Sequence, residues 1–312
     1  MDFSSILNLG VTALDLGLIG SLTVLALFLS YSMLNVCDLS TDGCFTFGAT
    51  VGAVVALAGY PFLSIFAAMA AGAVSGFVTA FLQTKMGINS LLSGIIVNTA
   101  LYSVNIAVMG NASVLNLFKT ETVFTKMKAA LEGTALSDFY KTFVAIIAVV
   151  LVGVILSLFL KTRLGLSIRA TGSNPEMVKT SSVNPTFTTI IGLCVSNSFT
   201  ALSGCLLAQA NKSVNIDIGS GMVTVALASL LIGGVFVSKG KKIPFRIIGA
   251  VLGAFVFRLV YTVALRFNMP AFMLKCVSAA IVVIAISGPY LKKRFPDIKR
   301  RFERKKGGAG GA

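Results

Sequence analysis

The stretch YKTFVAIIAVVLVGVILSLFL, Tyr140–Leu160, decides what kind of protein this chain is. It has no charged residue from Thr142 onward, and most of its side chains are Val, Ile, Leu, Phe or Ala. About 20 such residues in an α-helix match the roughly 30 Å hydrocarbon layer of a membrane. The run therefore predicts a membrane-spanning helix over 141–160.

The rest of the chain has the same character. Apolar residues make up 56% of the 312 residues and charged residues 12%, with a mean hydropathy of +0.91. In a soluble domain about 45–50% of the residues are apolar and about 25% are charged. The apolar runs are continuous rather than alternating, which excludes an outer-membrane barrel. We predict an all-α polytopic membrane protein of about nine transmembrane helices. Their expected positions are near 14–36, 45–59, 61–83, 89–109, 141–160, 187–209, 221–237, 246–266 and 271–290.

The charge distribution predicts an orientation in the membrane. The net charge of +15 comes from 26 Lys and Arg against 11 Asp and Glu, and nine of the basic residues lie in Lys292–Lys306. No nucleic-acid-binding pattern accompanies them, so we expect a cytoplasmic tail on anionic membrane lipid and no nucleic-acid partner. Counted from that tail, 18 basic residues fall inside and six outside, which puts the N-terminus outside.

The expected organisation is one transmembrane domain over 1–291, a basic cytoplasmic tail over 292–306, and a flexible GGAGGA linker over 307–312. On this topology the segment 37–44 is a cytoplasmic loop. The outer loop 110–140 contains an amphipathic helical pattern, with Val123 and Met127 opposite Lys126 and Lys128. This helix would be either a docking surface or a lid lying on the membrane.

The inner loop 161–186 carries the start signals of a short helix. Ser173 and Glu176 have the spacing of a capping box, and Asn174–Pro175 supplies an alternative cap with proline in the first turn. The helix is expected to continue to about Ser181 and to include Met177 and Lys179. It is either a mechanical lever between two spans or a well-capped connector.

Catalytic and metal-binding chemistry finds little support in the composition. The chain has no His, and its five Cys lack metal-ligand spacing. The nearest approach to a phosphate-binding loop, 234–242, has the wrong glycine spacing and no Ser or Thr after the Lys. We therefore expect no catalytic residue, no metal and no cofactor bound by this chain.

Polar residues within or beside the apolar segments are candidates for a translocation path, because burying them in lipid is costly. Each Asn or Ser either lines the path or forms a hydrogen bond between helices. Arg258 either attracts the carboxylate of a passing amino acid, or is tied to helix-end carbonyls, or extends toward the outer surface. The candidates are Asp38, Asp42, Asn98, Asn105, Ser196, Asn197, Ser198 and Arg258.

A weak internal similarity also exists between Cys37–Leu39 and Ile216–Ile218, each of which precedes a helix rich in small residues. With five spans between them, the two copies would have opposite orientations, as in an inverted repeat. Chance similarity explains the pattern equally well.

Longer stretches resemble a known family. RATGSNPEMVKTSSVNPTFTTIIGLCVSNSFTALSGCLLAQ (Arg169–Gln209) is similar to the coupling region of the membrane subunits of bacterial ABC importers of the branched-chain amino acid and ribose type. NVCDLSTDGCFTFGATVGAVVALAG (Asn35–Gly59) and GSGMVTVALASLLIGGVF (Gly219–Phe236) resemble two further segments of these permeases. Lys85–Leu117 looks closest to a Gram-positive branch linked to tryptophan and tyrosine. The cluster Gly240–Lys242 departs from the family's pattern.

The resemblance implies a permease subunit in the bacterial cytoplasmic membrane. Its expected partners are a second copy of itself, cytoplasmic ATP-binding subunits that hold ATP and Mg, and an extracellular substrate-binding lipoprotein. The expected substrate is an aromatic amino acid or a related compound, and the alternatives are a branched-chain amino acid, a sugar or a nucleoside. The ATP-binding subunits would contact the helix that includes Ser173, Asn174, Pro175, Glu176, Met177 and Lys179. An ion-coupled secondary transporter is the rival class, although the predicted spans contain no Glu.

Overall fold

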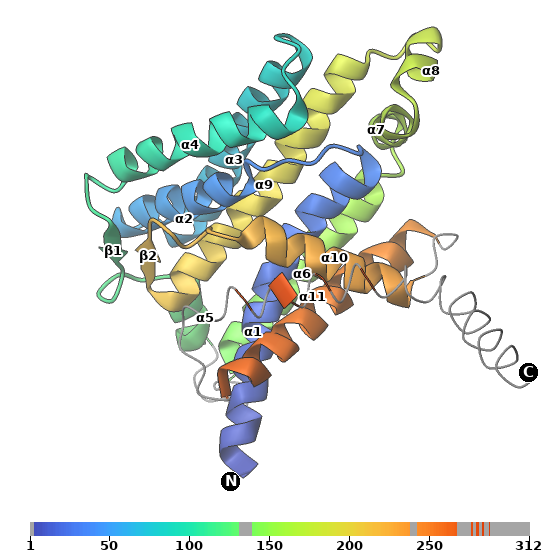
Figure 1. The fold of residues 1–312 in the computed structure, drawn as a ribbon. Coiled ribbons are helices and arrows are strands. Elements are labelled where there is room, and N and C mark those ends of the chain that lie inside the picture. The colour runs from blue at the N-terminus through green and yellow to red at the C-terminus, as the bar shows by residue number, and fades with distance from the viewer. Residues whose placement is uncertain are drawn as a thin grey trace, which may run out of the picture.

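A computed structural model describes residues 3–130, 139–237 and 242–266, with a few positions between 276 and 287. The expected span over 271–290 lies largely outside the described residues, and the basic tail and the GGAGGA linker lie entirely outside them. The described chain is predominantly helical (Figure 1). Its elements are α1 (Phe3–Leu27), η1 (Phe28–Met33), α2 (Thr41–Leu57), α3 (Pro61–Thr84), α4 (Ser90–Val108), β1 (Val114–Asn116), α5 (Val123–Ala130), α6 (Tyr140–Phe159), α7 (Arg163–Ser173), α8 (Pro175–Thr180), α9 (Pro185–Asn211), β2 (Ser213–Asn215), α10 (Met222–Phe236) and α11 (Ile243–Arg266).

Six helices in the described part are long and apolar enough to cross a membrane, which confirms a polytopic membrane protein. They are Gly10–Met33, Pro61–Thr84, Ser90–Val108, Tyr140–Phe159, Pro185–Asn211 and Ile243–Val263. Two expected spans form shorter apolar helices, α2 with 17 residues and α10 with 15. At 1.5 Å per residue these helices are only about 22–26 Å long, so neither bridges the hydrocarbon layer alone.

Helix α9 is the centre of the bundle. It contacts α1, α2 and α3, as Figure 1 shows, and it is the most buried of the six spans. Two glycines let its neighbours approach closely. A side chain at Gly48 of α2 would collide with the backbone of Ala201, and one at Gly72 of α3 would collide with that of Asn197. Small residues at these positions therefore allow the close helix contacts that are typical of membrane bundles.

The segment 37–44 was expected to be a loop on the cytoplasmic surface, but it is largely buried in the protein. After η1 the chain turns back into the bundle, where Asp38, Ser40 and Thr41 are at most 1% exposed. Helix α2 therefore starts inside the protein. Burial is tolerated because the polar groups of this segment form hydrogen bonds with one another and with α9, a compensation that composition alone does not reveal.

The outer loop 110–140 is seated on the bundle where it is described. Strand β1 pairs antiparallel with β2, with Leu115 opposite Val214. Helix α5 confirms the predicted amphipathic pattern. Its Val123 and Phe124 are buried, and the Val123 amide donates to Gln209 Oε1 at 2.9 Å. The helix packs on protein through its apolar face and leaves Lys126 and Lys128 exposed.

The inner loop contains two helices where one was expected. The additional helix, α7, is capped by Thr162, whose Oγ1 accepts from the amide of Gly165 at 3.2 Å. Ile168 of α7 is fully buried, and Gly172 lies against the backbone of Met33 and Leu34. The loop is thus packed rigidly on the end of η1.

Candidate translocation path and coupling helix

The buried carboxylate of Asp38 organises the start of α2. It accepts hydrogen bonds from the amide of Ser40 at 2.8 Å, from Ser40 Oγ at 2.6 Å and from Asn197 Nδ2 of α9 at 3.0 Å. Thr79 of α3 donates to Ser40 Oγ at 3.2 Å. The start of α2 is therefore joined to α9 through the Asp38 carboxylate and to α3 through Ser40, close to the positive end of the α2 dipole.

Two predicted asparagines of α4 lie beside the same turn. Asn105 is 1% exposed, and its Nδ2 donates to the carbonyl of Gly43 at 3.3 Å. Asn98 approaches Gly43 so closely that a Cβ there would lie 2.7 Å from its Oδ1. The structure thus brings Asp38, Asn197, Asn98 and Asn105 together around the first turn of α2. Asn105 forms a hydrogen bond from α4 to Gly43, and Asn197 forms one from α9 to Asp38.

Asp42 connects the two short helices. It lies in the first turn of α2, and its carboxylate accepts from the amides of Gly221 at 2.9 Å and Val223 at 2.8 Å, at the start of α10. A carboxylate at this end of a helix satisfies amides that have no partner within the helix and complements its dipole. The N-termini of α2 and α10 therefore meet inside the bundle.

The two predicted serines of α9 differ. Ser196 is 1% exposed and donates to the carbonyl of Ala26 in α1 at 2.7 Å. Ser198 donates at 2.8 Å to Cys194, one turn earlier in its own helix. Ser196 thus joins two helices, whereas the hydrogen bond of Ser198 is local.

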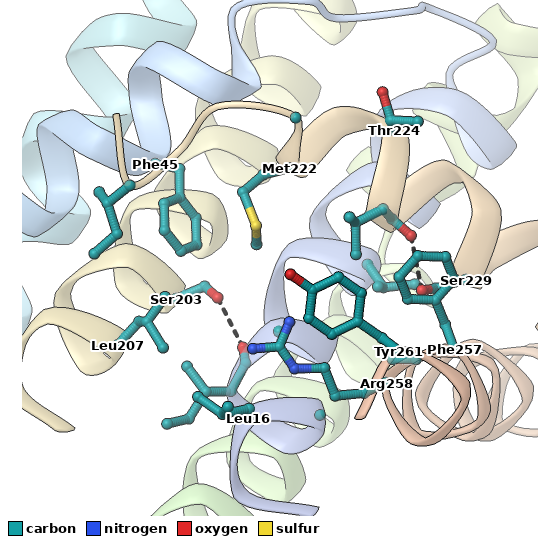
Figure 2. Close-up of a pocket in the computed structure, with 18 of the residues that line it drawn as sticks. Leu16, Phe45, Ser203, Leu207, Met222, Thr224, Ser229, Phe257, Arg258 and Tyr261 are labelled. Atoms are coloured by element: carbon teal, nitrogen blue, oxygen red, sulfur yellow. Dashed lines mark hydrogen bonds between the residues drawn. The ribbon is translucent and has the colours of Figure 1, made fainter. Parts of the chain in front are cut away.

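Arg258 lies apart from the cluster of Asp38, Asn197, Asn98 and Asn105. It lines a separate cavity of about 530 Å³ between α1, α10 and α11, with further walls from α2 and α9. Figure 2 shows its guanidinium directed into the cavity beside Tyr261. The guanidinium carbon lies 5.1 Å from the centre of the Tyr261 ring, a cation–π distance.

The predicted coupling helix exists as α8, but it is not capped by the expected capping box of Ser173 and Glu176. Ser173 is the last residue of α7, and its Oγ donates to the carbonyl of Arg169 at 3.0 Å, so the capping box was wrong. Asn174 is the cap, because its Oδ1 accepts from the amides of Glu176 and Met177 at 3.1 Å each. Ser173 does not cap α8 because it still belongs to α7, whereas Asn174 has the extended backbone of an N-cap residue, with φ −158° and ψ 98°.

The exposed surface of α8 is small and mixed in character. Met177 is 68% exposed, and Glu176 Oε1 accepts from Lys179 Nζ at 2.7 Å on the surface. Val178 is 5% exposed and packs inward. Pro175 occupies the first turn, where its missing amide proton costs nothing. The helix is anchored through one side and presents the other to solvent.

Comparison with known proteins places this arrangement in a family. The model of the branched-chain amino acid transport system permease component matches residues 11–286. The chain belongs to this family of ABC importer permeases. It is 30% identical over 276 residues to a tyrosine transport system permease protein of Clostridioides difficile, covering 88% of each chain. No solved structure matches the chain.

Two further relatives transport other solutes, according to their names. The galactose/methyl galactoside import permease MglC of Escherichia coli is 29% identical over 71% of this chain and 63% of its own length. The guanosine ABC transporter permease NupQ of Bacillus subtilis is 28% identical over 60% of this chain and 59% of its own. The membership makes the chain a transport subunit and a multi-pass protein of the cytoplasmic membrane, and it favours an ATP-driven importer over an ion-coupled carrier.

Sequence reasoning missed several polar residues of the permease that make long-range contacts. Thr79 reaches Ser40, and the fully buried Gln209 connects Ser64 of α3 with α5 through its two amide atoms. Gln209 carried a usable signal, since an amide at the end of an apolar span needs partners. Nothing in the sequence singled out Tyr261, because its role depends on the cavity that it shares with Arg258.

Proposed function

We propose that this permease forms the translocation path of an ATP-driven importer for an aromatic amino acid or a related compound. The observation that carries the proposal is the similarity to the tyrosine permease, which is 30% identical and extends over 88% of both chains. The galactoside and guanosine permeases match shorter parts of the chain, so a sugar or a nucleoside is a less favoured substrate. A branched-chain amino acid shares the carboxylate and remains the nearest alternative.

The proposed assembly has two copies of the permease, two ATP-binding subunits on the cytoplasmic side and a substrate-binding lipoprotein outside. ATP and Mg belong to the partner subunits. The exposed face of α8, with Met177 at 68% exposure, supports contact with an ATP-binding subunit, since a solvated methionine gains by burial in an interface. The exposed basic face of α5 supports docking of the binding protein.

The packing of the inner loop supports a route for coupling. A push on α8 would be transmitted to α7, whose Gly172 touches Met33 and Leu34. These two residues directly precede the buried segment that leads to Asp38 and the start of α2. This series of packed contacts supports a route by which a movement of α8 would reach the start of this segment.

The orientation and the symmetry of the permease are part of the same proposal. We assign the N-terminus to the outside, the C-terminus to the inside, and nine helices to the complete domain over 1–291. The adjacent N-termini of the short helices α2 and α10 support an inverted repeat, although Asp38 is buried and Asp217 is exposed. An impermeant maleimide should label a cysteine at Ser113 and spare one at Ser173 in intact cells, and the reverse order would contradict the orientation.

Uptake by the complete importer in proteoliposomes tests the function. Radiolabelled L-tyrosine should accumulate only with ATP and the binding protein, and excess galactose or guanosine should not compete. Accumulation of galactose or guanosine in place of tyrosine would contradict the substrate assignment. Uptake that persists without ATP would contradict the importer class.

The coupling role of α8 has a matched pair of variants. Asn174→Ala removes both capping hydrogen bonds and weakens α8 by about 1 kcal/mol. We expect the ATPase activity to lose its stimulation by loaded binding protein while the permease still assembles. Ser173→Ala alters only a bond within α7 and should leave stimulation unchanged. Equal stimulation in both variants would make α8 a plain connector.

A further inference from the structure

The cavity around Arg258 has the size and the lining of a small-molecule site. Its volume of about 530 Å³ falls within the roughly 300–1,000 Å³ that is usual for ligand pockets. Most of its walls are apolar, and Phe45 and Phe257 lie in them with at most 1% of their surface exposed to solvent. Figure 2 shows Phe45 and Met222 facing Arg258 and Tyr261 across the open space.

Arg258 is the only charged residue among the lining residues that the structure describes. Its Nε is buried and has no hydrogen-bond partner there, and no ion pair is formed by its guanidinium within the same residues. A cation inside a membrane protein is costly unless an anion, a carbonyl or water meets it. The described residues of the cavity offer this cation no anion.

Two hydroxyl groups of the wall already donate to backbone carbonyls. Ser203 Oγ donates to the carbonyl of Ile19 at 2.7 Å, and Ser229 Oγ donates to that of Val225 at 2.8 Å. Asp42 is near the start of α10, but its carboxylate is directed to the amides of Gly221 and Val223. The described wall thus provides one cation set in a largely apolar surface.

Two glycines of α1 create the space. Gly17 lets α11 approach, since a Cβ there would lie 3.4 Å from the Cβ of Arg258. Gly20, one turn further, has nothing within 4 Å of the position of a Cβ and faces the cavity that it lines. A side chain at Gly20 would start in open space at its Cβ and would take up room in the cavity.

We propose that this cavity is a substrate station on the translocation path, in which Arg258 binds the carboxylate of the solute and the aromatic walls receive its apolar part. The inference rests on the proposed function and narrows it. A guanidinium pairs with a carboxylate through two parallel hydrogen bonds, which a neutral sugar or nucleoside cannot form. The station would therefore favour amino acids over the neutral solutes of the related permeases.

The geometry also suits transient binding. An engineered apolar cavity of about 150 Å³ holds a benzene molecule, so 530 Å³ accommodates an aromatic ring with its polar end and some water. The Tyr261 ring lies against one side of the guanidinium and attracts its positive charge, which partly stabilises the cation when no solute is bound. A conducting site must attract its solute and still release it, and one cation without a dedicated set of further donors meets both needs.

Transport by four variants of the complete importer tests the proposal with L-tyrosine as probe. Arg258→Gln should lower uptake at least tenfold with unchanged membrane abundance and thermal stability, and Arg258→Lys should retain part of the uptake because it retains the charge. Gly20→Leu should block uptake by filling the cavity. Gly10→Leu, the same change on the same helix where a side chain also meets nothing, should leave uptake normal.

A second measurement needs no transport. Phenylglyoxal modifies arginine side chains, and mass spectrometry can follow the modification at Arg258 in the purified permease. Millimolar 4-hydroxyphenylpropionate, which has the carboxylate and the ring, should slow modification at Arg258 several-fold. Tyramine, which has the ring and an amine but no carboxylate, should not slow it.

The outcomes separate this inference from the proposed function. Protection by the carboxylate in a permease that does not import tyrosine would uphold the station and contradict the substrate assignment. Wild-type tyrosine uptake in Arg258→Gln, or equal protection by tyramine, would overturn the station and leave the importer function intact. Should Arg258→Gln fail to fold, the protection assay and Gly20→Leu still decide, since a structural role predicts no protection by either compound.

Discussion

Asp38, which is buried, and Arg258, which is half-buried with a buried Nε, differ in how their surroundings satisfy their charges. The carboxylate of Asp38 accepts three hydrogen bonds at 2.6–3.0 Å and is packed among α2, α3 and α9. Arg258 is directed into an open cavity, and its Nε has no partner in the described part of the chain. A polar group whose partners are all protein stabilises the bundle, whereas one that faces unfilled space is available to a solute.

The largest effect is expected at Asp38. Asp38→Ala leaves the buried donors of Ser40 and Asn197 without an acceptor, at about 1–3 kcal/mol for each. Loss of folded protein should follow, measured as membrane abundance and thermal stability in detergent. The exchange Asp38→Asn with Asn197→Asp keeps an amide and a carboxylate in contact and should recover part of the loss. A stable Asp38→Ala variant with impaired uptake would place Asp38 in the path instead.

A smaller effect is expected at Asp42, which links the stabilising region to the cavity wall. Asp42→Ala removes the acceptor for the amides of Gly221 and Val223 and should cost about 1–2 kcal/mol, the value of a helix cap. Asp42→Asn retains one acceptor oxygen and should lose less. Thermal unfolding measures both, and a stability equal to wild type in Asp42→Ala would show that α10 does not depend on α2.

The smallest effects separate the two serines of α9. Ser196→Ala removes a bond between helices at 2.7 Å and should cost about 0.6–1 kcal/mol. Ser198→Ala removes only a bond within the helix and should stay within about 0.5 kcal/mol. Neither variant should change tyrosine uptake. Impaired uptake with unchanged stability in either one would extend the path beyond the Arg258 cavity to this part of α9.

The amino-acid sequence by itself determined the features that depend on neighbouring residues. The apolar runs predicted membrane spans because the length of a helix has to match the hydrocarbon layer. Asn174–Pro175 predicted the start of α8 because a cap bonds amides two and three residues ahead. The resemblance of Arg169–Gln209 to importer permeases likewise rests on contiguous residues, and the family match over 11–286 confirmed it.

Only the tertiary structure decided which polar residues meet. Asp38 and Asn197 are 159 positions apart, and Arg258 faces glycines of α1 more than 230 positions earlier, so no local spacing reveals either contact. The burial of 37–44 and the additional helix α7 were missed for the same reason, since both depend on surfaces supplied by other segments. Helix formation is local, but the satisfaction of a buried charge depends on how distant helices pack.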